Sequence, residues 1–329
     1  MARTDIRDFQ ENGRYSGVYI LNRKQLKNTK TGNEYLQVEL SDSSARISCN
    51  LWNSDDFHSL FDSLEEGGFV RADLNASTYN GTMQGTLNSI SHANPTVEEM
   101  EGLVPRIKED PALLHADLLH RAENIQDEVC RNISLTILND FRKWLLVWPA
   151  AKSMHHHEIG GLILHMHEMA DYAEAIHQVT PCFDMDYVLT GIIAHDIGKI
   201  REYTAGKTGL LTDTSTAGRL LAHPYIGAAY VGKLCERFHA SKEQSEILQH
   251  LVLSHHGDLE KGAVTVPQTT EALILHIVDE ASASIRLYSE VSGKTAPGTW
   301  SDNTFGIPDN YGGTRGKLYV PACTKKENR

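Results

Sequence analysis

Histidine and aspartate residues in the second half of the chain have the types and the spacing of a metal centre. His195 and Asp196 stand side by side, directly after the apolar run 188–193 and before Gly198 and Lys199. A neutral imidazole and a carboxylate are both good ligands for a divalent metal, and a nearby lysine suits a phosphate. A single His-Asp pair is a weak signal, so its meaning depends on the residues around it.

Histidines gather around this pair. Thirteen of the 17 histidines lie between His155 and His276, far more than an even spread along 329 residues would place there. One such histidine is usually a hydrogen-bonded core residue, but burying several without ligands would be costly. Four imidazoles and two carboxylates predict a centre for two divalent transition-metal ions, in which Asp196 is the bridging carboxylate. The predicted ligands are His165, His195, Asp196, His223, His255 and Asp279.

Other residues near the predicted centre are candidates for substrate contacts. Lys199 would suit a phosphate; the alternative is a solvated lysine at a helix end. His256 follows His255 and could be a ligand in its place or hold the substrate. His155 and His156 could line the mouth of the cleft or cap the helix that follows them.

Helical periodicity places these side chains on a series of helices. From residue 97 to about residue 290 the apolar residues recur at helical spacing. The Gly/Thr-rich stretch 203–218 is long enough to be a lid or substrate loop, and the tail 295–329 is expected to be extended or partly disordered. Helices that would carry or follow the candidate ligands are predicted at 159–176, 186–195, 223–238, 241–256 and 269–288.

The first 90 residues alternate instead, which predicts β-strands. Strands at 17–21, 35–40, 45–52 and 70–74, a helix at 57–64 and a hairpin at Asn80-Gly81 suit the OB-fold, a five-stranded Greek-key barrel. Such barrels commonly bind single strands through aromatic and basic residues. The alternative is that Trp52 and some tyrosines are core residues and that the lysines form a solvated loop. The candidates are Tyr19, Arg23, Lys24, Lys27, Lys30, Tyr35, Arg46, Trp52 and Tyr79.

Composition narrows the class of protein. The formal net charge of -12 excludes a basic surface over the whole protein, so a nucleic acid would need a local basic strip or a metal-lined cleft. The start of the chain has no apolar secretory region, and no apolar run is long enough for a membrane helix. Five scattered cysteines fit a reduced protein, so we expect a cytoplasmic location and no membrane contact.

The order His…His-Asp…His…His…Asp resembles the HD-domain superfamily of metal-dependent phosphohydrolases. More specific similarity to the YhaM-type 3′-to-5′ exoribonucleases extends through nearly the whole chain in the same order. It includes His195-Asp-Ile-Gly-Lys199, Leu253-Ser-His-His-Gly257 and Lys317-Leu-Tyr-Val-Pro321. The other similar segments are 24–32, 51–52, 148–156, 159–162, 223–227 and 267–279.

This resemblance implies a two-domain α+β protein. Residues 1–92 would form an OB-fold nucleic-acid-binding domain and residues 93–148 a linker and helical segment. Residues 149–292 would form an all-α HD domain, followed by an extended tail at 293–329. The implied activity is hydrolysis of single-stranded RNA, with single-stranded DNA as a further substrate, from the 3′ end to nucleoside 5′-monophosphates. The implied cofactors are two divalent metal ions. Mn²⁺ is the preferred ion, and Mg²⁺, Co²⁺, Fe²⁺ and Ni²⁺ are the alternatives. The implied assembly is a homo-oligomer.

Two departures from the family pattern concern substrate preference and subunit contacts. Glu158 stands where the family usually has an aromatic residue, and 280–284 replaces the usual acidic and lysine residues. Two rival functions remain. One is an HD nucleotide phosphohydrolase or cyclic (oligo)nucleotide phosphodiesterase, against which the fused barrel argues. The other is an inactive nucleic-acid-binding protein, against which the full set of ligand types argues.

Overall fold

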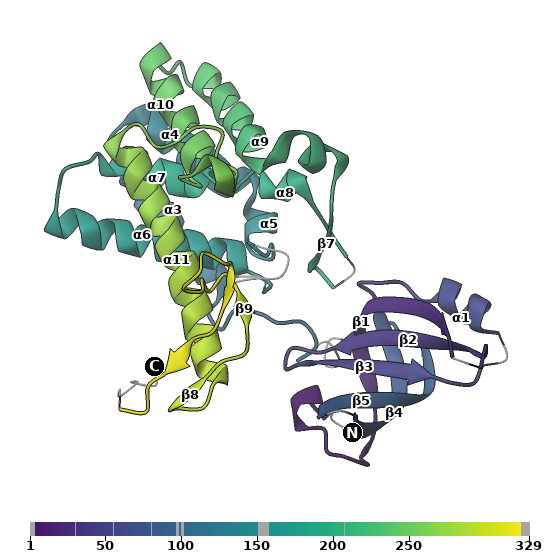
Figure 1. Ribbon diagram of the computed structural model, residues 1–329. Helices are drawn as coiled ribbons and strands as arrows, with labels where there is room; N and C mark the ends of the chain where they lie inside the picture. The colour runs from purple at the N-terminus through teal and green to yellow at the C-terminus, as the bar shows by residue number, and fades with distance from the viewer. Residues whose placement is uncertain are drawn as a thin grey trace. The chain divides into compact units, whose positions relative to one another are not determined.

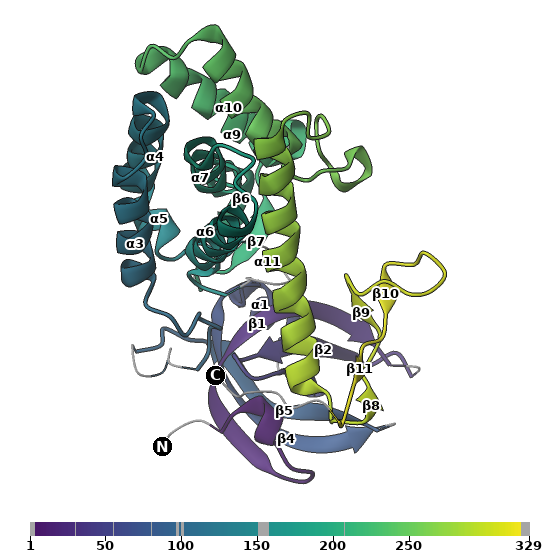
Figure 2. The ribbon, with the colours of Figure 1, turned by 90° about the vertical axis from the view of Figure 1, so that its left-hand side faces the viewer.

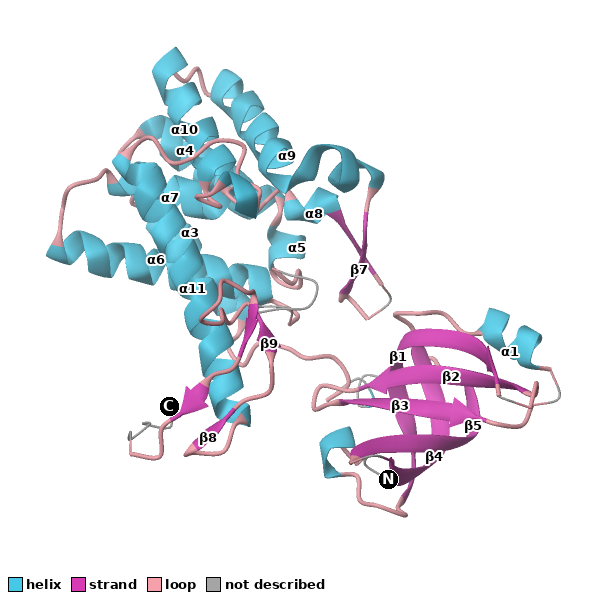
Figure 3. Ribbon diagram, in the orientation of Figure 1, coloured by secondary structure: helices cyan, strands magenta, loops and turns pink. Residues whose placement is uncertain are grey.

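The computed structural model describes residues 4–323, apart from 30, 55, 80, 97–98, 100–101, 151–157 and 207. The chain divides into a β-barrel unit and a helical unit (Figures 1 and 3). The first unit contains Met1–Lys108 and Tyr203–Asp213, and the second contains Glu109–Glu202 and Thr214–Arg329. The predicted α+β, two-domain class is confirmed.

Five strands close the barrel of the first unit. They are paired in the order β1-β2-β3-β5-β4, with β3 and β5 parallel and the other pairs antiparallel. A short helix, α1 (Phe57–Ser63), connects β3 to β4 and is capped by Asp56. The strands are β1 (Arg14–Asn28), β2 (Glu34–Ser41), β3 (Arg46–Leu51), β4 (Phe69–Tyr79) and β5 (Thr82–His92). This is the OB-like barrel that the alternating sequence predicts.

The barrel core explains two features of the sequence. Alternate residues of β2 and β3 point inward, and a Cβ at Gly85 would lie 2.4 Å from Cys49 Sγ. Only glycine therefore lets β5 approach β3 this closely. Tyr19 is fully buried in the same core. The expectation that Tyr19 contacts a nucleic acid is therefore wrong, because its ring fills the barrel.

The stretch 203–218, which we expected to be a lid or substrate loop, contains a β-hairpin and the start of α9. Strands β6 (Tyr203–Ala205) and β7 (Leu211–Thr214) pair with each other. A Cβ at Gly67 would lie 2.8 Å from Thr212 Cγ2, so this hairpin approaches the barrel, with which it shares a unit. A segment inserted between two helices thus belongs to the β unit.

Nine α-helices are described in the second unit. Figure 2 shows α6 and α7 nearly end-on, with α3 and α4 on one side and α11 on the other. The central position of α6 and α7 agrees with their apolar faces, which are buried over most of their length. The helices are α3 (Pro111–Glu123), α4 (Glu128–Asp140), α5 (Arg142–Leu145), α6 (Gly161–Val179), α7 (Met185–Ala194), α8 (Lys199–Glu202), α9 (Thr216–Arg237), α10 (Lys242–Ser254) and α11 (Thr270–Lys294).

Side-chain caps mark where several helices begin. Ser241 and Gln244 form a reciprocal capping box at α10, and Asp184 accepts a backbone hydrogen bond at the start of α7. Helix α9 begins at Thr216, after the Ser215 cap, and not at His223 as the periodicity predicts. The predicted start at His223 directly follows a kink at Ala222, which separates two helical segments.

The described part of the tail contains four short strands that pair with one another. Strand β8 (Thr299–Trp300) pairs with β11 (Tyr319–Val320), and β9 (Thr304–Phe305) pairs with β10 (Arg315–Gly316). Among the described helices, none has both the length and the hydropathy that crossing a bilayer requires.

Arg121 connects α3 to α6 through three carboxylates. Its guanidinium donates to Asp117 at 2.6 Å, to Asp171 at 2.6 Å and to Glu174 at 2.9 Å. Charge-assisted hydrogen bonds contribute roughly 1.5–3 kcal/mol when buried. Because these carboxylates are partly exposed, we expect Arg121→Ala to lower the free energy of unfolding by about 1–2 kcal/mol, relative to the parent. Urea unfolding followed by circular dichroism measures this difference.

Lys242→Ala is the control for that experiment. Its side chain is 90% exposed and lies 3.6 Å from Glu246. We expect a change within about 0.5 kcal/mol, which is usual for an exposed substitution. Equal midpoints for the two variants would contradict a stabilising role for the Arg121 network.

Candidate metal centre

The buried carboxylate of Asp196 lies at the middle of the site. It follows α7, whose apolar residues anchor the end of the helix at His195. Asp196 Oδ2 accepts a hydrogen bond from Lys199 Nζ at 2.6 Å and lies 3.3 Å from His195 Nε2. Asp196 Oδ1 faces the other way, 3.5 Å from His223 Nε2 and 3.8 Å from His255 Nε2. The two oxygens therefore face different sets of imidazoles.

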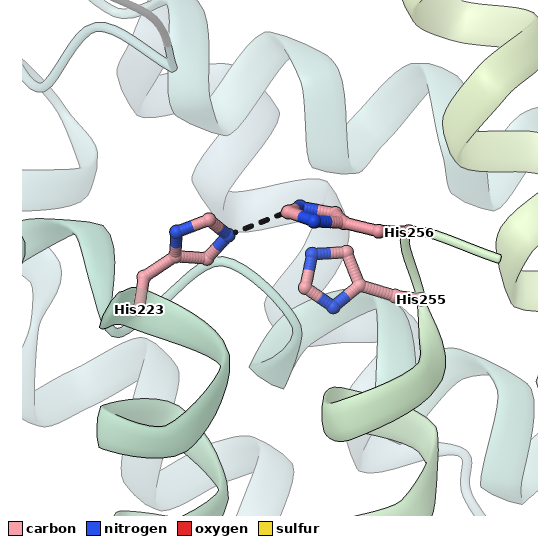
Figure 4. Close-up of side chains that lie close together, drawn as sticks. All are labelled: His223, His255 and His256. Carbon is pink, nitrogen blue, oxygen red and sulfur yellow. Dashed lines mark hydrogen bonds between the residues drawn. The ribbon is translucent and has the colours of Figure 1, made fainter. Parts of the chain in front are cut away.

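Two clusters of possible ligands lie on either side of this carboxylate. In each cluster, one ligand atom per residue lies within 4.8 Å of the others. The first contains His165 from α6, His195 after α7 and Asp279 from α11. The second contains His223, His255 and His256, and Figure 4 shows these three rings turned toward one another from α9 and the end of α10. All six ligand residues predicted from the sequence are brought together.

Hydrogen bonds at the Nδ1 atoms determine which ring nitrogens can bind a metal. His195 Nδ1 donates to the carbonyl oxygen of Ile192 at 2.8 Å, and His255 Nδ1 donates to that of Val252 at 2.6 Å. A carbonyl oxygen only accepts, so each neutral ring keeps its lone pair on Nε2. Both Nε2 atoms face the interior of the site, which is the tautomer that a metal ligand needs.

His223 and His165 are oriented in the same way by side chains. His223 Nδ1 donates to the buried Glu202 carboxylate at 2.8 Å. His165 Nδ1 lies 2.9 Å from Ser282 Oγ, and that hydroxyl donates to Glu168 Oε2 at 2.8 Å. Since the serine hydrogen is directed to Glu168, the serine oxygen accepts from His165. Carboxylate–histidine pairs of this kind are usual behind metal-binding imidazoles.

The orientation of these rings fits a bound cation. With its proton on Nδ1, neutral His165 would present a lone pair to Asp279 Oδ1 at only 3.1 Å, which is repulsive without a proton or a metal between them. Within the described chain, His195 Nε2, His255 Nε2 and Asp196 Oδ1 are buried without a hydrogen-bond partner. Such atoms are costly unless something binds them. The donor set of imidazoles and carboxylates suits divalent transition metals.

The pKa shifts agree with this donor set. Burial lowers the pKa of His255 well below its ordinary value, and protonation of the neighbouring His195 or His256 would lower it further. Burial, with His223 nearby, lowers the pKa of His256 to about 4. Both rings are therefore neutral near pH 7 and available as ligands. His256 shares a hydrogen bond with His223 at 3.2 Å, so its role as ligand or substrate contact stays a prediction.

At His195, Asp196 and Asp279, neighbouring charges outweigh the effect of burial on the pKa. Burial lowers the pKa of His195, but the carboxylates of Asp196 and Asp279 outweigh it and leave the pKa above its ordinary value. Burial raises the pKa of Asp196, yet Lys199 and His195 bring it well below its ordinary value. Burial raises the pKa of Asp279, yet His165, when its Nε2 carries a proton, brings it below its ordinary value. The site thus keeps two ionised carboxylates.

Candidate substrate contacts outside this centre have varied surroundings. Lys24 Nζ donates to the carbonyl oxygens of Phe61 and Leu64, at the end of α1. Lys27 Nζ donates to Gln37 at 2.6 Å on the barrel. A substrate role for these lysines remains a prediction. His155, His156 and Lys30 lie outside the described residues.

Tyr35 and Trp52 form an aromatic pair on the barrel. Their ring centroids are 4.6 Å apart with an interplanar angle of 28°, and Trp52 is 45% exposed. Tyr35 is half-buried, but the exposed Trp52 ring can extend the stack onto a nucleobase. Their proposed contact with substrate therefore has a suitable surface.

The sequence reasoning missed three residues that orient the ligands. Glu202, Glu168 and Ser282 are hydrogen-bonded behind His223 and His165, as described above. Ser282 lies within the segment 280–284 that departs from the family pattern. That departure was a signal of a change near the metal centre, but only proximity in space connects Ser282 to His165.

Comparisons with known proteins agree with the arrangement of the helical unit. The HD domain family matches residues 162–284, which include all the candidate ligands. This match and the geometry identify an HD domain in the chain, of the type found in metal-dependent phosphohydrolases.

Several solved structures are distantly similar to parts of the chain. The mitochondrial single-stranded DNA-binding protein Rim1 from S. cerevisiae is 14% identical, with 26% of this chain and 100% of that chain covered and a TM-score of 0.23. A replication protein A heterotrimer bound to single-stranded DNA is 12% identical, covering 27% of this chain and 65% of that chain with a TM-score of 0.22. Asparaginyl-tRNA synthetase from Entamoeba histolytica is 9% identical, with 45% of this chain and 38% of that chain covered and a TM-score of 0.23. These values transfer no substrate or partner to this chain.

Gly198 permits a close approach that positions His223. A Cβ at Gly198 would lie 2.2 Å from the carbonyl oxygen of His223 and 3.0 Å from the backbone nitrogen of Gly227. Both contacts are with backbone, which cannot rotate away. We expect Gly198→Ala to cost about 1–3 kcal/mol of stability, as overpacking does. By displacing His223, it should also lower metal retention. Urea unfolding and metal analysis after dialysis measure the two effects.

Gly293→Ala supplies the matched control within the same unit. Its Cβ would meet nothing within 4 Å, and the residue lies in α11. Alanine there should be neutral or stabilise by up to about 1 kcal/mol through helix propensity. Full metal retention in Gly198→Ala would show that this close approach does not position His223.

Proposed function

We propose that the chain is a metal-dependent 3′-to-5′ exonuclease that hydrolyses single-stranded RNA, with single-stranded DNA as the alternative polymer, to nucleoside 5′-monophosphates. The observation that carries this proposal is the position of Asp196 between two ligand clusters, with Lys199 beside it. The resemblance to the YhaM-type exoribonucleases supports the direction of cleavage. The barrel fused to the HD domain supports a polymer substrate.

The residues of the centre suit two divalent ions, for which we propose Mn²⁺. His165, His195 and Asp279 would hold one ion, His223 and His255 the other, and Asp196 would contact both. Mg²⁺, Co²⁺, Fe²⁺ or Ni²⁺ are the alternatives. When bound, two such ions supply a hydroxide at neutral pH and offset charge on the phosphoryl and leaving oxygens.

The surrounding residues contribute orientation and charge. Glu202 and Ser282 hold the Nε2 atoms of His223 and His165 toward the interior, which lowers the cost of ordering the site when a substrate binds. Lys199 is anchored by Asp196, and its partly exposed ammonium is available to a phosphate. In this proposal Lys199 contacts the scissile phosphate or its neighbour and offsets its negative charge.

The barrel offers a contact for the upstream strand. Tyr35 and Trp52 provide a stacking surface that tolerates any base, because every base has a π-face. Holding the strand there would keep it bound between successive cleavages. This local contact accommodates a polyanion despite the formal net charge of -12.

Loss of Asp196 tests the centre. We expect Asp196→Ala to reduce the degradation of 3′-end-intact RNA by about a thousandfold or more, because several kcal/mol of transition-state stabilisation depend on the bound ions. Metal analysis should find about two ions per parent chain and fewer in the variant. Chelation should abolish the parent's activity, and Mn²⁺ should restore it.

The control and the competing substrates belong to the same experiment. Asp302→Ala removes an exposed aspartate of the tail and should leave the rate unchanged. RNA and DNA labelled at either end, dNTPs and cyclic dinucleotides are digested side by side. Undiminished cleavage by Asp196→Ala or after chelation contradicts the two-metal centre, and preferred hydrolysis of dNTPs or cyclic dinucleotides contradicts the exonuclease. No metal and no hydrolysis would favour an inactive binding protein.

Trp52→Ala tests the barrel contact. Base–aromatic stacking contributes roughly 1–3 kcal/mol per base, so affinity for single-stranded RNA should fall about tenfold. Fluorescence anisotropy with chelated protein measures binding without cleavage. Trp300→Ala removes another exposed tryptophan, in the tail, and should not change the affinity. Equal loss in both variants would exclude a specific role for Trp52.

A further inference from the structure

A separate cavity of about 190 Å³ lies against α8 and α9 in the helical unit. Its lining includes Ile197 and Gly198 from the turn after Asp196, Tyr225 and Tyr230 from α9, and Phe141 beside α5. None of the candidate metal ligands lines it. The cavity is therefore distinct from the metal centre.

The walls of the cavity suit a planar ring. Phe141 and Tyr230 meet edge to face, with centroids 5.3 Å apart and an interplanar angle of 90°. Tyr225 is 52% exposed, and buried Ile197 and Ile226 provide apolar surface. Pockets for drug-sized ligands are roughly 300–1,000 Å³. A smaller apolar space with aromatic walls fits one ring system, held by stacking and burial.

Two cations accompany these aromatic residues. Arg201 and Lys233 both line the cavity and are exposed. Across the described ranges, neither the Arg201 guanidinium nor Lys233 Nζ has an ion-pair or hydrogen-bond partner. Unpaired cations beside an apolar space are notable in a chain of net charge -12. Guanidinium and ammonium groups are the usual partners of phosphate oxygens.

We propose that this cavity binds one nucleotide, with the base against Phe141, Tyr225 and Tyr230 and the phosphate at Arg201 and Lys233. The choice of a nucleotide among aromatic anions rests on the proposed function, which produces nucleoside 5′-monophosphates. The same chemistry has two sources: a released mononucleotide, or a nucleotide within the bound strand. Both present a ring and a phosphate to the same residues.

The cavity wall is continuous with the backbone of a candidate ligand. Leu221 lines the cavity, and His223 follows it after Ala222. Ala222 has φ 57° and ψ 158°, a region that is close to one adopted almost only by glycine. Gly198, which also lines the cavity, closely approaches the carbonyl oxygen of His223. A nucleotide that shifts Leu221 or Gly198 would therefore alter the position of His223.

The test measures binding of adenosine 5′-monophosphate to the full chain in excess chelator, which removes any contribution from bound metal. Lys233→Glu and Tyr225→Ala should each weaken binding at least about tenfold, because they remove a charge-assisted contact and a stacking partner. Lys242→Glu makes the same charge change on an exposed lysine of α10 and should have no effect. Circular dichroism confirms that the variants are folded.

Adenosine, inorganic phosphate and a short oligoadenylate distinguish the sources. Monophosphate binding that Lys233→Glu weakens supports the site and a released nucleotide as its ligand. Binding of the oligonucleotide alone, weakened by the same variant, supports the site and a nucleotide of the strand. Absence of binding, equal affinities in Lys233→Glu and Lys242→Glu, or adenosine binding as tightly as its monophosphate would overturn the proposal.

The same measurement on Asp196→Ala separates this proposal from the proposed exonuclease. Because Asp196 does not line the cavity, that variant should retain monophosphate binding while losing hydrolysis. An active parent enzyme without this binding would overturn the nucleotide cavity alone. Binding without any hydrolysis by the parent would overturn the exonuclease alone.

Discussion

The burial of one carboxylate constrains the whole helical unit. The Asp196 side chain is only 2% exposed, and an isolated charge at that depth would be strongly destabilising. Lys199 pairs with one oxygen, and His195, His223 and His255 surround the group. These partners come from separate helices, so the packing of α7, α9 and α10 is tied to one ionised group. A buried carboxylate surrounded by imidazoles suits a bound cation.

A second layer of hydrogen bonds gives this polar interior its direction. Main-chain carbonyls hold His195 and His255, Glu202 holds His223, and Ser282 holds His165. In each case the acceptor takes the Nδ1 proton, which leaves Nε2 to face the centre. The last carbonyls of a helix lack intrahelical partners. They can therefore accept the Nδ1 protons of His195 and His255, and no side-chain acceptor is needed. The fold thus selects the tautomers before any metal binds.

The two units divide the proposed work according to their physical character. The barrel exposes Trp52, which stacks on the half-buried Tyr35, whereas the helical unit buries its polar metal-ligand candidates among apolar helices. Stacking is tolerant of base identity, and buried ligands are intolerant of small displacements. The metal centre is therefore the part of the molecule in which packing matters most. The aromatic cavity near α8 and α9 combines exposed and buried groups, because the exposed cations of Arg201 and Lys233 flank buried apolar walls.

Local pattern was enough to identify the elements and the ligand types. Alternation in the first 90 residues indicated the barrel, and helical spacing indicated the supports of His165, His195, His255 and Asp279. These properties depend on neighbours a few residues apart, which a single sequence displays. The exposed state of Trp52 and the burial of Tyr19 could not be separated in this way, because both are aromatic residues on alternating strands.

The sequence by itself determined the barrel, the helices and the set of imidazoles and carboxylates. Only the tertiary structure decided which oxygen of Asp196 faces which ring, that Ser282 stands behind His165, and that the hairpin β6–β7 joins the barrel unit. The kink at Ala222 was also hidden, since its backbone conformation is rare for alanine. Such features arise from contacts between residues far apart in the chain, and a local sequence pattern carries no information about those contacts.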